Sequence, residues 1–317
     1  MVGPVTDKLR LWLAEDFGFA VRELEQVHEG ADVAAEVWRA TGELSYAVKW
    51  SGGGTDAGPR ATAYLASRGI RGVPSPVPTL GGDLWSEREG GRLSVVPWIA
   101  GERAARTGLT VEQWTSYGAL LAEVHRTEPP AELQAVLPRI NPINARMPAL
   151  THSIQARLAT PKDAIEEELA TVWRAHSDTI ATIVEQTEDL ARRDLGGIPV
   201  LCHADPHLGN VLVAAGQLYL IDWDDVVLAP REQDLLFFLG GMGSLGPATT
   251  AQKDAFFSGY GAVDLDATRL TYYRCARALE DIAQWADQAI DGPDREDCLR
   301  ILQGVLSPDG LAVQALA

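Results

Sequence analysis

Residues 201–230 read LCHADPHLGNVLVAAGQLYLIDWDDVVLAP, and this stretch decides the fold. Two apolar triplets, VLV and LYL, flank a turn that contains a glycine, and this pattern predicts a β-hairpin. His203, Asp205 and Asn210 precede the hairpin in the order H-x-D-x4-N. Asp222 follows the second strand, twelve residues after Asn210. Because a hairpin reverses the direction of the chain, we expect Asp222 to return to the residues that precede the first strand.

This order of residues is typical of the catalytic loop of kinases. Asp205 is the candidate base or orienting group for a substrate hydroxyl, and His203 is expected to brace the loop backbone. Asn210 and Asp222 offer the oxygen ligands that Mg²⁺ prefers in proteins. The simpler alternative is a polar loop in which Asp205 caps a turn. That alternative does not explain why Asn210, the hairpin and Asp222 follow Asp205 in this order.

The rest of the chain divides into a β-rich part and a helical part near residues 97–101. Before this boundary, alternating apolar residues and turn signals predict an antiparallel sheet with one inserted helix that starts at Pro59. After the boundary, helical periodicity predominates. The predicted elements are a helix over 6–17, strands over 24–30, 33–40 and 44–50, a hairpin around EREGGR, and helices over 110–126, 162–194, 249–260 and 266–291. We therefore predict an α+β fold with a nucleotide-binding lobe over 1–100 and a larger helical lobe over 101–317, which carries the catalytic loop and the substrate site.

Lys49 is the second candidate for the site. It stands in the predicted strand 44–50, on the face opposite three large apolar neighbours. Kinases place on such a strand the lysine that contacts the nucleotide phosphates. A lone strand lysine is usually a solvated edge residue, so this interpretation depends on the catalytic loop downstream. Segment 28–38 is expected to turn over the phosphates, and its only glycine is Gly30.

The composition narrows the class of protein. Among 317 residues, 44 acidic side chains outnumber 27 basic ones, which gives a net charge of −17. Such a charge disfavours nucleic-acid binding and would attract cationic small molecules. The three separated cysteines form neither a disulfide framework nor a CxxC metal site. Without a secretory signal or a run of about 18 apolar residues, the sequence predicts a cytoplasmic protein that does not span a membrane. It does not indicate an oligomeric state.

The sequence resembles the aminoglycoside phosphotransferase family. The similar segments span nearly the whole chain: EGADVAAEVWRA, YAVKW, VVPWI, VLCHADPHLGNVLV, LYLIDWDDVVLAPREQDLLF and YYRCARALEDIA. The resemblance implies a bilobal, protein-kinase-like fold with a nucleotide in the cleft between the lobes. It also implies transfer of the γ-phosphoryl group of ATP or GTP to a hydroxyl of an antibiotic. The similarity is greatest to the branch that phosphorylates the aminocyclitol spectinomycin.

The resemblance assigns a role to each candidate residue. It implies that Asp205 is the catalytic base and that Lys49 contacts the phosphates. Asn210 and Asp222 would be the Mg²⁺ ligands. The linker between the lobes would recognise the nucleotide base through Val96, Trp98 and Ile99. Asp234, which follows the hairpin in the chain, would anchor the catalytic loop.

One departure from the family pattern concerns the partner of Lys49. The family's helix normally offers a Glu to the strand lysine, but the candidate helix PRATAYLASRG contains none. Asp56, just before this helix, is the nearest acid. Either Asp56 substitutes for the Glu, or phosphates alone hold Lys49.

The residues that recognise the substrate are harder to identify from the sequence than the catalytic residues. A cationic antibiotic would suit carboxylates beside an aromatic wall. The candidates are two acids after the metal aspartate and three residues of a late helix: Asp224, Asp225, Glu280, Asp281 and Trp285. The alternative is an ordinary solvated helix face, in which Asp281 pairs with Arg277.

Other functions stay open on the sequence alone. A kinase of another small-molecule hydroxyl, on a nucleoside, a macrolide antibiotic or a metabolite, would use the same motif. A metal-dependent hydrolase would use His203, Asp205 and His207 as zinc ligands, but it would leave Asn210 unexplained. A kinase-like binding protein without catalysis would need a lost base or metal ligand. A protein kinase would need an activation-loop segment after Asp222, and none is present.

Overall fold

The computed structural model describes residues 4–27, 35–53, 55–139, 146–239 and 248–316. The chain forms two compact units. The β-rich unit consists of Met1–Leu109, Thr127–Leu137 and Leu208–Val226. The helical unit consists of Thr110–Arg126, Pro138–His207 and Val227–Ala317. This grouping does not test the lobe boundary near residue 100, which stays a prediction.

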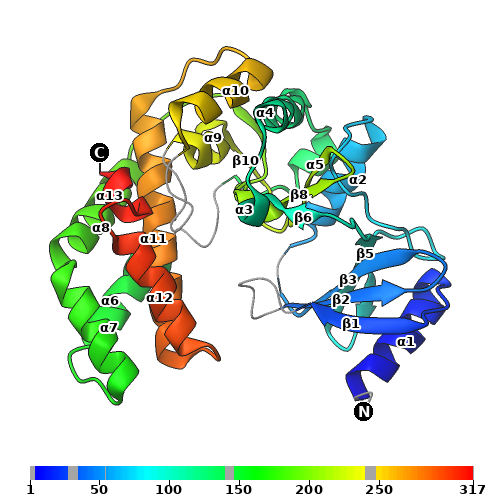
Figure 1. Cartoon of the computed structure of the whole chain (residues 1–317), viewed down its shortest axis with the longest axis horizontal. Helices are drawn as coiled ribbons and strands as arrows, with labels where there is room; N and C mark the ends of the chain where they lie inside the picture. The colour runs from blue at the N-terminus through cyan, green and yellow to red at the C-terminus, as the bar shows by residue number, and fades with distance from the viewer. Residues whose placement is uncertain (1–3, 28–34, 54, 140–145, 240–247, 317) are drawn as a thin grey trace. The chain divides into compact units, whose positions relative to one another are not determined.

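An antiparallel sheet of five strands dominates the β-rich unit (Figure 1). Its strand order is β1 (Glu23–Val27), β2 (Ala35–Thr41), β3 (Ser45–Ser51), β5 (Gly91–Pro97) and β4 (Ser86–Arg88). Helix α1 (Pro4–Phe17) packs Leu9 and Leu13, both fully buried, against the apolar side chains of this sheet. Val48 of β3 is one of those side chains, so the alternation of β3 leaves Lys49 on the opposite face.

A second, three-stranded sheet in the same unit carries the catalytic-loop hairpin. The strands are β6 (Glu102–Arg103), β8 (Val211–Ala214) and β9 (Gln217–Leu220), with the 3₁₀ turn η2 (Leu208–Asn210) before β8. Helix α2 (Ala57–Ser67) approaches the segment after β9 closely, because a Cβ atom at Gly58 would lie 2.7 Å from the carbonyl oxygen of Trp223. The short helices α3 (Ala104–Thr107) and α5 (Ala131–Gln134) complete the unit.

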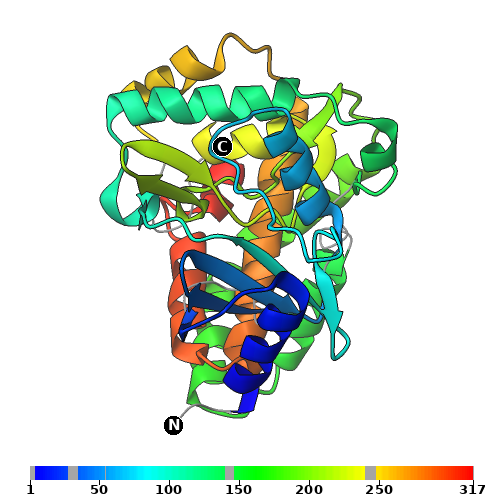
Figure 2. The same cartoon turned by 90° about the vertical axis from the view of Figure 1, so that its right-hand side faces the viewer.

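The helical unit is built around one long helix, α11 (Ala267–Asp291). Its buried alanines let neighbouring helices pack closely around a continuous apolar core. The helices that contribute to this core are α6 (Met147–Arg157), α7 (Ala164–Ala175), α8 (Ser177–Ala191), α12 (Arg295–Leu306) and α13 (Leu311–Ala315) (Figure 2).

The rest of the helical unit surrounds the catalytic loop. A two-stranded antiparallel sheet, β7 (Pro199–Cys202) with β10 (Val227–Pro230), leads the chain into the loop and away from the hairpin. Helix α9 (Glu232–Leu239) follows β10, and α4 (Val111–Arg126) packs against α10 (Thr250–Tyr260) (Figure 1). The α4–α10 packing is very close, since a Cβ atom at Gly118 would lie 1.9 Å from the carbonyl oxygen of Phe256.

The predicted class of fold is confirmed: an antiparallel N-terminal sheet is followed by a larger, mainly helical part. The helices expected over 6–17, 110–126, 249–260 and 266–291 form within two residues of those bounds. The stretch 162–194 contains two helices rather than one, because α7 ends and α8 begins around His176. Segment 28–34, which includes Gly30, lies outside the described residues. In the described part of the chain, no helix is long and apolar enough to cross a membrane.

Candidate active site

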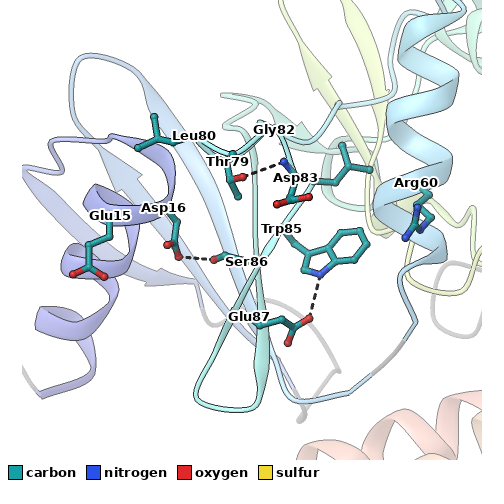
Figure 3. Close-up of a pocket in the computed structure, with 12 residues that line it drawn as sticks. Glu15, Asp16, Arg60, Thr79, Leu80, Gly82, Asp83, Trp85, Ser86 and Glu87 are labelled. Carbon is teal, nitrogen blue, oxygen red and sulfur yellow. Dashed lines mark hydrogen bonds between the residues drawn. The ribbon is translucent and has the colours of Figure 1, made fainter.

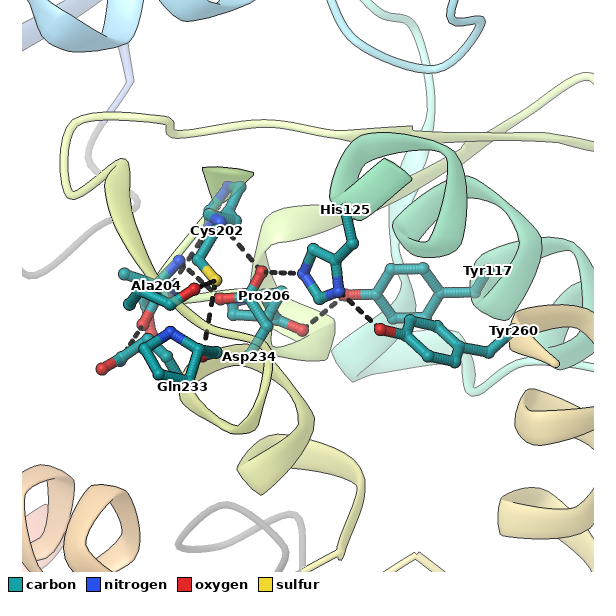
Figure 4. Close-up of polar contacts among 12 residues, drawn as sticks. Tyr117, His125, Cys202, Ala204, Pro206, Gln233, Asp234 and Tyr260 are labelled. Atoms are coloured by element: carbon teal, nitrogen blue, oxygen red, sulfur yellow. Dashed lines mark hydrogen bonds and ion pairs between the residues drawn. The ribbon is translucent and has the colours of Figure 1, made fainter. Parts of the chain in front are cut away.

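The predicted catalytic loop, residues 203–207, is held by the carboxylate of Asp234 at the start of α9 (Figure 4). The backbone N–H groups of His203 and Ala204 donate to the two oxygens of Asp234, at 2.9 and 2.7 Å. Ala204 has a positive φ of 72°, a conformation that a non-glycine residue adopts only when its surroundings fix it. Asp234 is fully buried. Its two bonds therefore stabilise the loop conformation that sets the direction of Asp205.

Two helices supply a second layer of contacts to this loop (Figure 4). His125 of α4 lies between Asp234 and Tyr260, with its Nε2 3.0 Å from the carboxylate and its Nδ1 2.6 Å from the hydroxyl. The hydroxyl of Tyr117, also on α4, donates to the carbonyl oxygen of Pro206. His125 is not among the residues that the sequence pattern singled out. The histidine contacts a residue more than a hundred positions away, and no local pattern signals such a contact.

Asp205 lies between two basic side chains of the helical unit. Its Oδ1 accepts from Nη1 of Arg277 at 2.7 Å, and its Oδ2 lies 3.3 Å from Nε2 of His207. Its backbone N–H donates to Nδ1 of His203 at 3.2 Å. The side chain is 19% exposed. Burial opposes ionisation, but the positive charge of Arg277 and the nearby histidines outweigh it and hold the pKa of Asp205 well below its usual range. Asp205 is therefore a carboxylate at neutral pH.

Arg277 was not predicted to contact the catalytic loop. Its guanidinium lies on α11, contacts Asp205, and also contacts the carboxylate of Asp281 one helical turn later, with Nε 2.9 Å from Oδ1. The same group lies 5.4 Å from the ring centre of Phe237. The spacing of Arg277 and Asp281 is visible in the sequence, whereas the contact with Asp205 spans 72 residues.

Asn210 and Asp222 lie at the same end of the β8–β9 hairpin in the β-rich unit. Val211 pairs with Leu220, and the N–H of Ile221 donates to the carbonyl oxygen of Asn210 at 2.9 Å. Asp222 has a positive φ of 64°, which directs the chain sharply after β9. A carboxylate and a carboxamide oxygen from these two positions form a hard donor set that fits a divalent cation such as Mg²⁺.

Lys49 contacts two carboxylates of the segment that follows β9. Its ammonium lies 3.5 Å from Asp222 and closer still to Asp224. Asp56 instead pairs with Arg60, at 2.7 Å, on the first turn of α2. In this structure the acids that pair with Lys49 are therefore Asp222 and Asp224, whereas Asp56, the residue before the helix that the sequence offered as one possible substitute, pairs with Arg60.

The predicted linker begins in β5 and continues beyond it. Val96 pairs with Ala47 in the sheet, and the N–H of Trp98 donates to the carbonyl oxygen of Ser45 at 3.0 Å. The indole of Trp98 is half-buried beneath the guanidinium of Arg39, 5.0 Å away. The carbonyl oxygen of Ile99 accepts from Gly101 at 3.0 Å. These bonds fix the backbone on which base recognition would depend.

The five predicted substrate residues belong to different units. Asp224 and Asp225, both half-buried, lie in the β-rich unit. On α11 of the helical unit, Glu280 accepts from Gln284 at 3.2 Å and Trp285 packs against the apolar core. Burial raises the pKa of Asp281, although Arg277 opposes this effect. The sequence alternative, a pair between Arg277 and Asp281, is thus present, but it is part of the network around Asp205.

The His203, Asp205 and His207 group does not have the geometry of a zinc site. Nδ1 of His203 already accepts from the backbone of Asp205. Among the described residues, three potential ligands converge instead at His125, Cys202 and Asp234, all buried. The carboxylate there is bonded to the loop backbone and to His125. In each of these two triads, atoms that could bind a metal are therefore already engaged in hydrogen bonds within the protein.

A hollow of about 730 Å³ lies elsewhere in the β-rich unit (Figure 3). The C-terminal turn of α1, residues 79–85 and β4 line it, and Arg60 of α2 lies over the ring of Trp85. The acids Glu15 and Asp16 on its wall are paired with Arg88. No site residue predicted from the sequence lines this hollow, and all of those residues are described.

Comparison with known proteins identifies the family and the fold. A model of the phosphotransferase enzyme family matches residues 59–279. A crystal structure of spectinomycin phosphotransferase, in complex with ADP and spectinomycin, is 26% identical to the chain and has a TM-score of 0.88. The match covers 98% of this chain and 97% of that one. A comparison with curated proteins found no significant match.

Two more distant structures support the fold alone. An amicoumacin kinase in complex with AMP-PNP, Ca²⁺ and Ami is 15% identical, with a TM-score of 0.64 over 97% of this chain and 93% of that one. An ethanolamine kinase from Plasmodium vivax is 14% identical, with a TM-score of 0.61 over 95% and 88%. Because the family model covers most of the chain, the chain belongs to the phosphotransferase enzyme family and is a small-molecule kinase with an alcohol group as phosphoryl acceptor.

Proposed function

We propose that this chain transfers the γ-phosphoryl group of ATP or GTP to a hydroxyl of an aminocyclitol antibiotic such as spectinomycin. The observation that carries the proposal is the similarity to spectinomycin phosphotransferase along nearly the whole of both chains. The braced loop around Asp205 and the net charge of −17 also support it. An acidic protein attracts cationic substrates, and spectinomycin carries amines.

In the proposed reaction, the substrate hydroxyl oxygen forms a bond to the γ-phosphorus while the bond from that phosphorus to the bridging oxygen breaks. The nucleoside diphosphate leaves with the electrons of the broken bond, and the hydroxyl proton passes to a carboxylate oxygen of Asp205. Because the transition state of phosphoryl transfer is loose, positioning and charge neutralisation contribute most of the rate. Asp205, which is ionised and held by the loop, would accept a hydrogen bond from the substrate hydroxyl and so orient it.

Other residues of the chain would hold the nucleotide. Lys49 would contact its phosphates, and the backbone of Val96, Trp98 and Ile99 would recognise its base. Asn210 and Asp222 would hold Mg²⁺, whose charge, when bound, neutralises phosphate oxygens. His203 and Asp234 support the loop from the helical unit. In this proposal residues 1–100 serve nucleotide binding, and residues 101–317 carry the catalytic loop and the acids that receive the antibiotic.

A panel of acceptors tests the proposed function. The chain is incubated with Mg²⁺ and either ATP or GTP, together with spectinomycin, kanamycin, streptomycin, a macrolide or ethanolamine. Mass spectrometry then identifies any product with an added phosphate. We expect phosphorylation of spectinomycin by wild-type protein and none by Asp205→Asn. Phosphate on a different acceptor alone would contradict the proposed substrate, and no phosphorylated product at all would contradict the proposed function.

A further inference from the structure

We propose that Arg277 is a positioning residue of the phosphoryl-transfer reaction, which holds the carboxylate of Asp205 in a fixed direction and couples it to helix α11. This inference rests on the proposed function, because it gives Arg277 a task in the same site. Arg277 acts through Asp205 and not on the substrate. The sequence pattern offered Arg277 only as a partner of Asp281, not as a residue of the reaction.

The first argument is the geometry of the guanidinium. Nη1 donates to Asp205 at 2.7 Å, and Nε lies 2.9 Å from Asp281 in an ion pair that lacks hydrogen-bond geometry, so one planar group lies between a loop acid and a helix acid. The face of the guanidinium lies near Phe237 of α9. The side chain of Arg277 is only 17% exposed. A guanidinium held from three sides keeps its direction, and its partner carboxylate is held with it.

The second argument is that the two oxygens of Asp205 have different partners. Oδ1 contacts Arg277 and Oδ2 lies near His207, while the backbone N–H of Asp205 contacts His203. Rotation of the carboxylate would break both side-chain contacts at once. The loop bonds of Asp234 fix the backbone, whereas Arg277 fixes the side-chain torsion.

The third argument is electrostatic. Among the described residues, the charged and titratable groups that interact with Asp205 include Arg277 and Asp281 from α11, His203 and His207 from the loop, and Tyr117 from α4. Arg277 contributes the largest favourable effect on ionisation of Asp205, against a burial effect that favours the neutral acid. Loss of Arg277 would therefore raise the pKa of Asp205 and free its side chain.

Three variants separate positioning from folding. Arg277→Gln removes the charge and the planar group. Arg277→Lys keeps the charge but cannot make the same two contacts from a planar fork. Arg274→Gln is the matched control, because Arg274 is a half-buried arginine of the same helix that donates to the carbonyl oxygen of Leu239 at 2.9 Å. Thermal melting of all three variants shows whether they are folded.

Kinetics with nucleotide and spectinomycin give the first measurement. A misplaced catalytic group can cost on the order of 10²-fold in rate, so we expect Arg277→Gln to lower kcat by roughly 10- to 100-fold. The KM for nucleotide should stay unchanged, because Arg277 acts through Asp205 and is not among the residues that we propose hold the nucleotide. Arg277→Lys should recover part of kcat, and Arg274→Gln should behave like the wild type. Equal kcat in Arg277→Gln and Arg274→Gln would overturn the proposal.

Carboxyl ¹³C NMR gives a measurement that does not depend on activity. The signal of Asp205 is assigned by its absence in Asp205→Asn and is followed as the pH falls. We expect a midpoint below the ordinary aspartate range in the wild type and in Arg277→Lys, and a higher midpoint in Arg277→Gln. An ordinary midpoint in the wild type would overturn the proposal even if Arg277→Gln does not fold. If no antibiotic is phosphorylated, the proposed function fails while this titration still decides whether Arg277 controls Asp205.

Discussion

At the scale of single residues, the acid beside Lys49 comes from an unexpected place. Asp224 follows the hairpin strand β9, and its contact with Lys49 spans 175 residues. Such a pair has no local signal, and the sequence left two alternatives for Lys49: Asp56 near α2, or phosphates alone. The structure pairs Asp56 with Arg60 instead. An acid after the hairpin thus lies where it can orient Lys49, the residue that we propose contacts the phosphates.

This arrangement predicts the effect of Asp224→Asn. Removal of the carboxylate should leave the Lys49 ammonium less well oriented. Partly exposed ion pairs contribute about 0.2–1 kcal/mol, so the KM for nucleotide should rise by at most about fivefold. Asp56→Asn is the control and should leave this KM unchanged. A rise in KM for Asp56→Asn alone would show that Asp56 is the functional partner after all.

The motif residues were easier to predict than their neighbours. Asp205, Asn210 and Asp222 are separated by at most seventeen residues, and two apolar triplets around a glycine-containing turn mark the hairpin between them. Their catalytic and metal roles stay predictions. Arg277 and His125 could not be predicted, because their contacts depend on how α11 and α4 pack around the loop.

At the scale of elements, the packing of α4 against α10 determines the support of the catalytic loop. Helix α4 carries both Tyr117 and His125, which contact the loop and its anchor. The two helices approach so closely that a Cβ atom at Gly118 or at Gly259 would lie within 2 Å of a backbone carbonyl oxygen of the other helix. Neither glycine can gain a side chain without displacing a helix.

Gly118→Ala should therefore destabilise the protein. Overpacking in a rigid interior costs about 1–3 kcal/mol, and backbone is less able to move than a side chain. Gly304→Ala in α12 is the control, because nothing lies within 4 Å of the added Cβ atom. A helical Gly→Ala change in open space should stabilise by about 0.5–1 kcal/mol. Denaturant unfolding measures both, and equal stability of Gly118→Ala and wild type would refute the close packing.

The elements differ in how well the sequence predicts them. Long amphipathic helices such as α11 have enough turns to show their period, and their bounds were predicted closely. Strands β7 and β10 have four residues each, too few to show alternation, and their pairing across the hairpin was not predicted. The break between α7 and α8 has no proline or glycine to mark it.

At the scale of the whole molecule, the excess of acidic residues makes the response to acid informative. Asp163 caps α7 through the backbone N–H groups of Ile165 and Glu166, and its carboxylate also pairs with Arg295. The hydrogen bonds from Arg295 and the capped helix lower the pKa of Asp163 from its ordinary value of 3.8 to about 2. A lowered pKa in the folded state stabilises the protein above the ordinary pKa. This stabilisation is lost as the pH falls from about 4 towards 2.

Asp163→Asn should make the melting temperature less dependent on pH in this range. Asn caps a helix about as well as Asp, so the cap survives while the titrating charge is lost. Arg295→Gln removes the other partner and should flatten the same part of the curve. Melting curves between pH 2 and 5 measure the effect, and an unchanged slope in both variants would contradict the assignment.

The central claim is that the loop carboxylate of Asp205 takes part in phosphoryl transfer. Asp205→Asn keeps the size of the side chain and removes its basic oxygen. A general base contributes on the order of 10²–10⁴-fold, so kcat with Mg²⁺, nucleotide and spectinomycin should fall by that order while calorimetry shows unchanged nucleotide binding. Turnover close to wild type in this folded variant would contradict the claim.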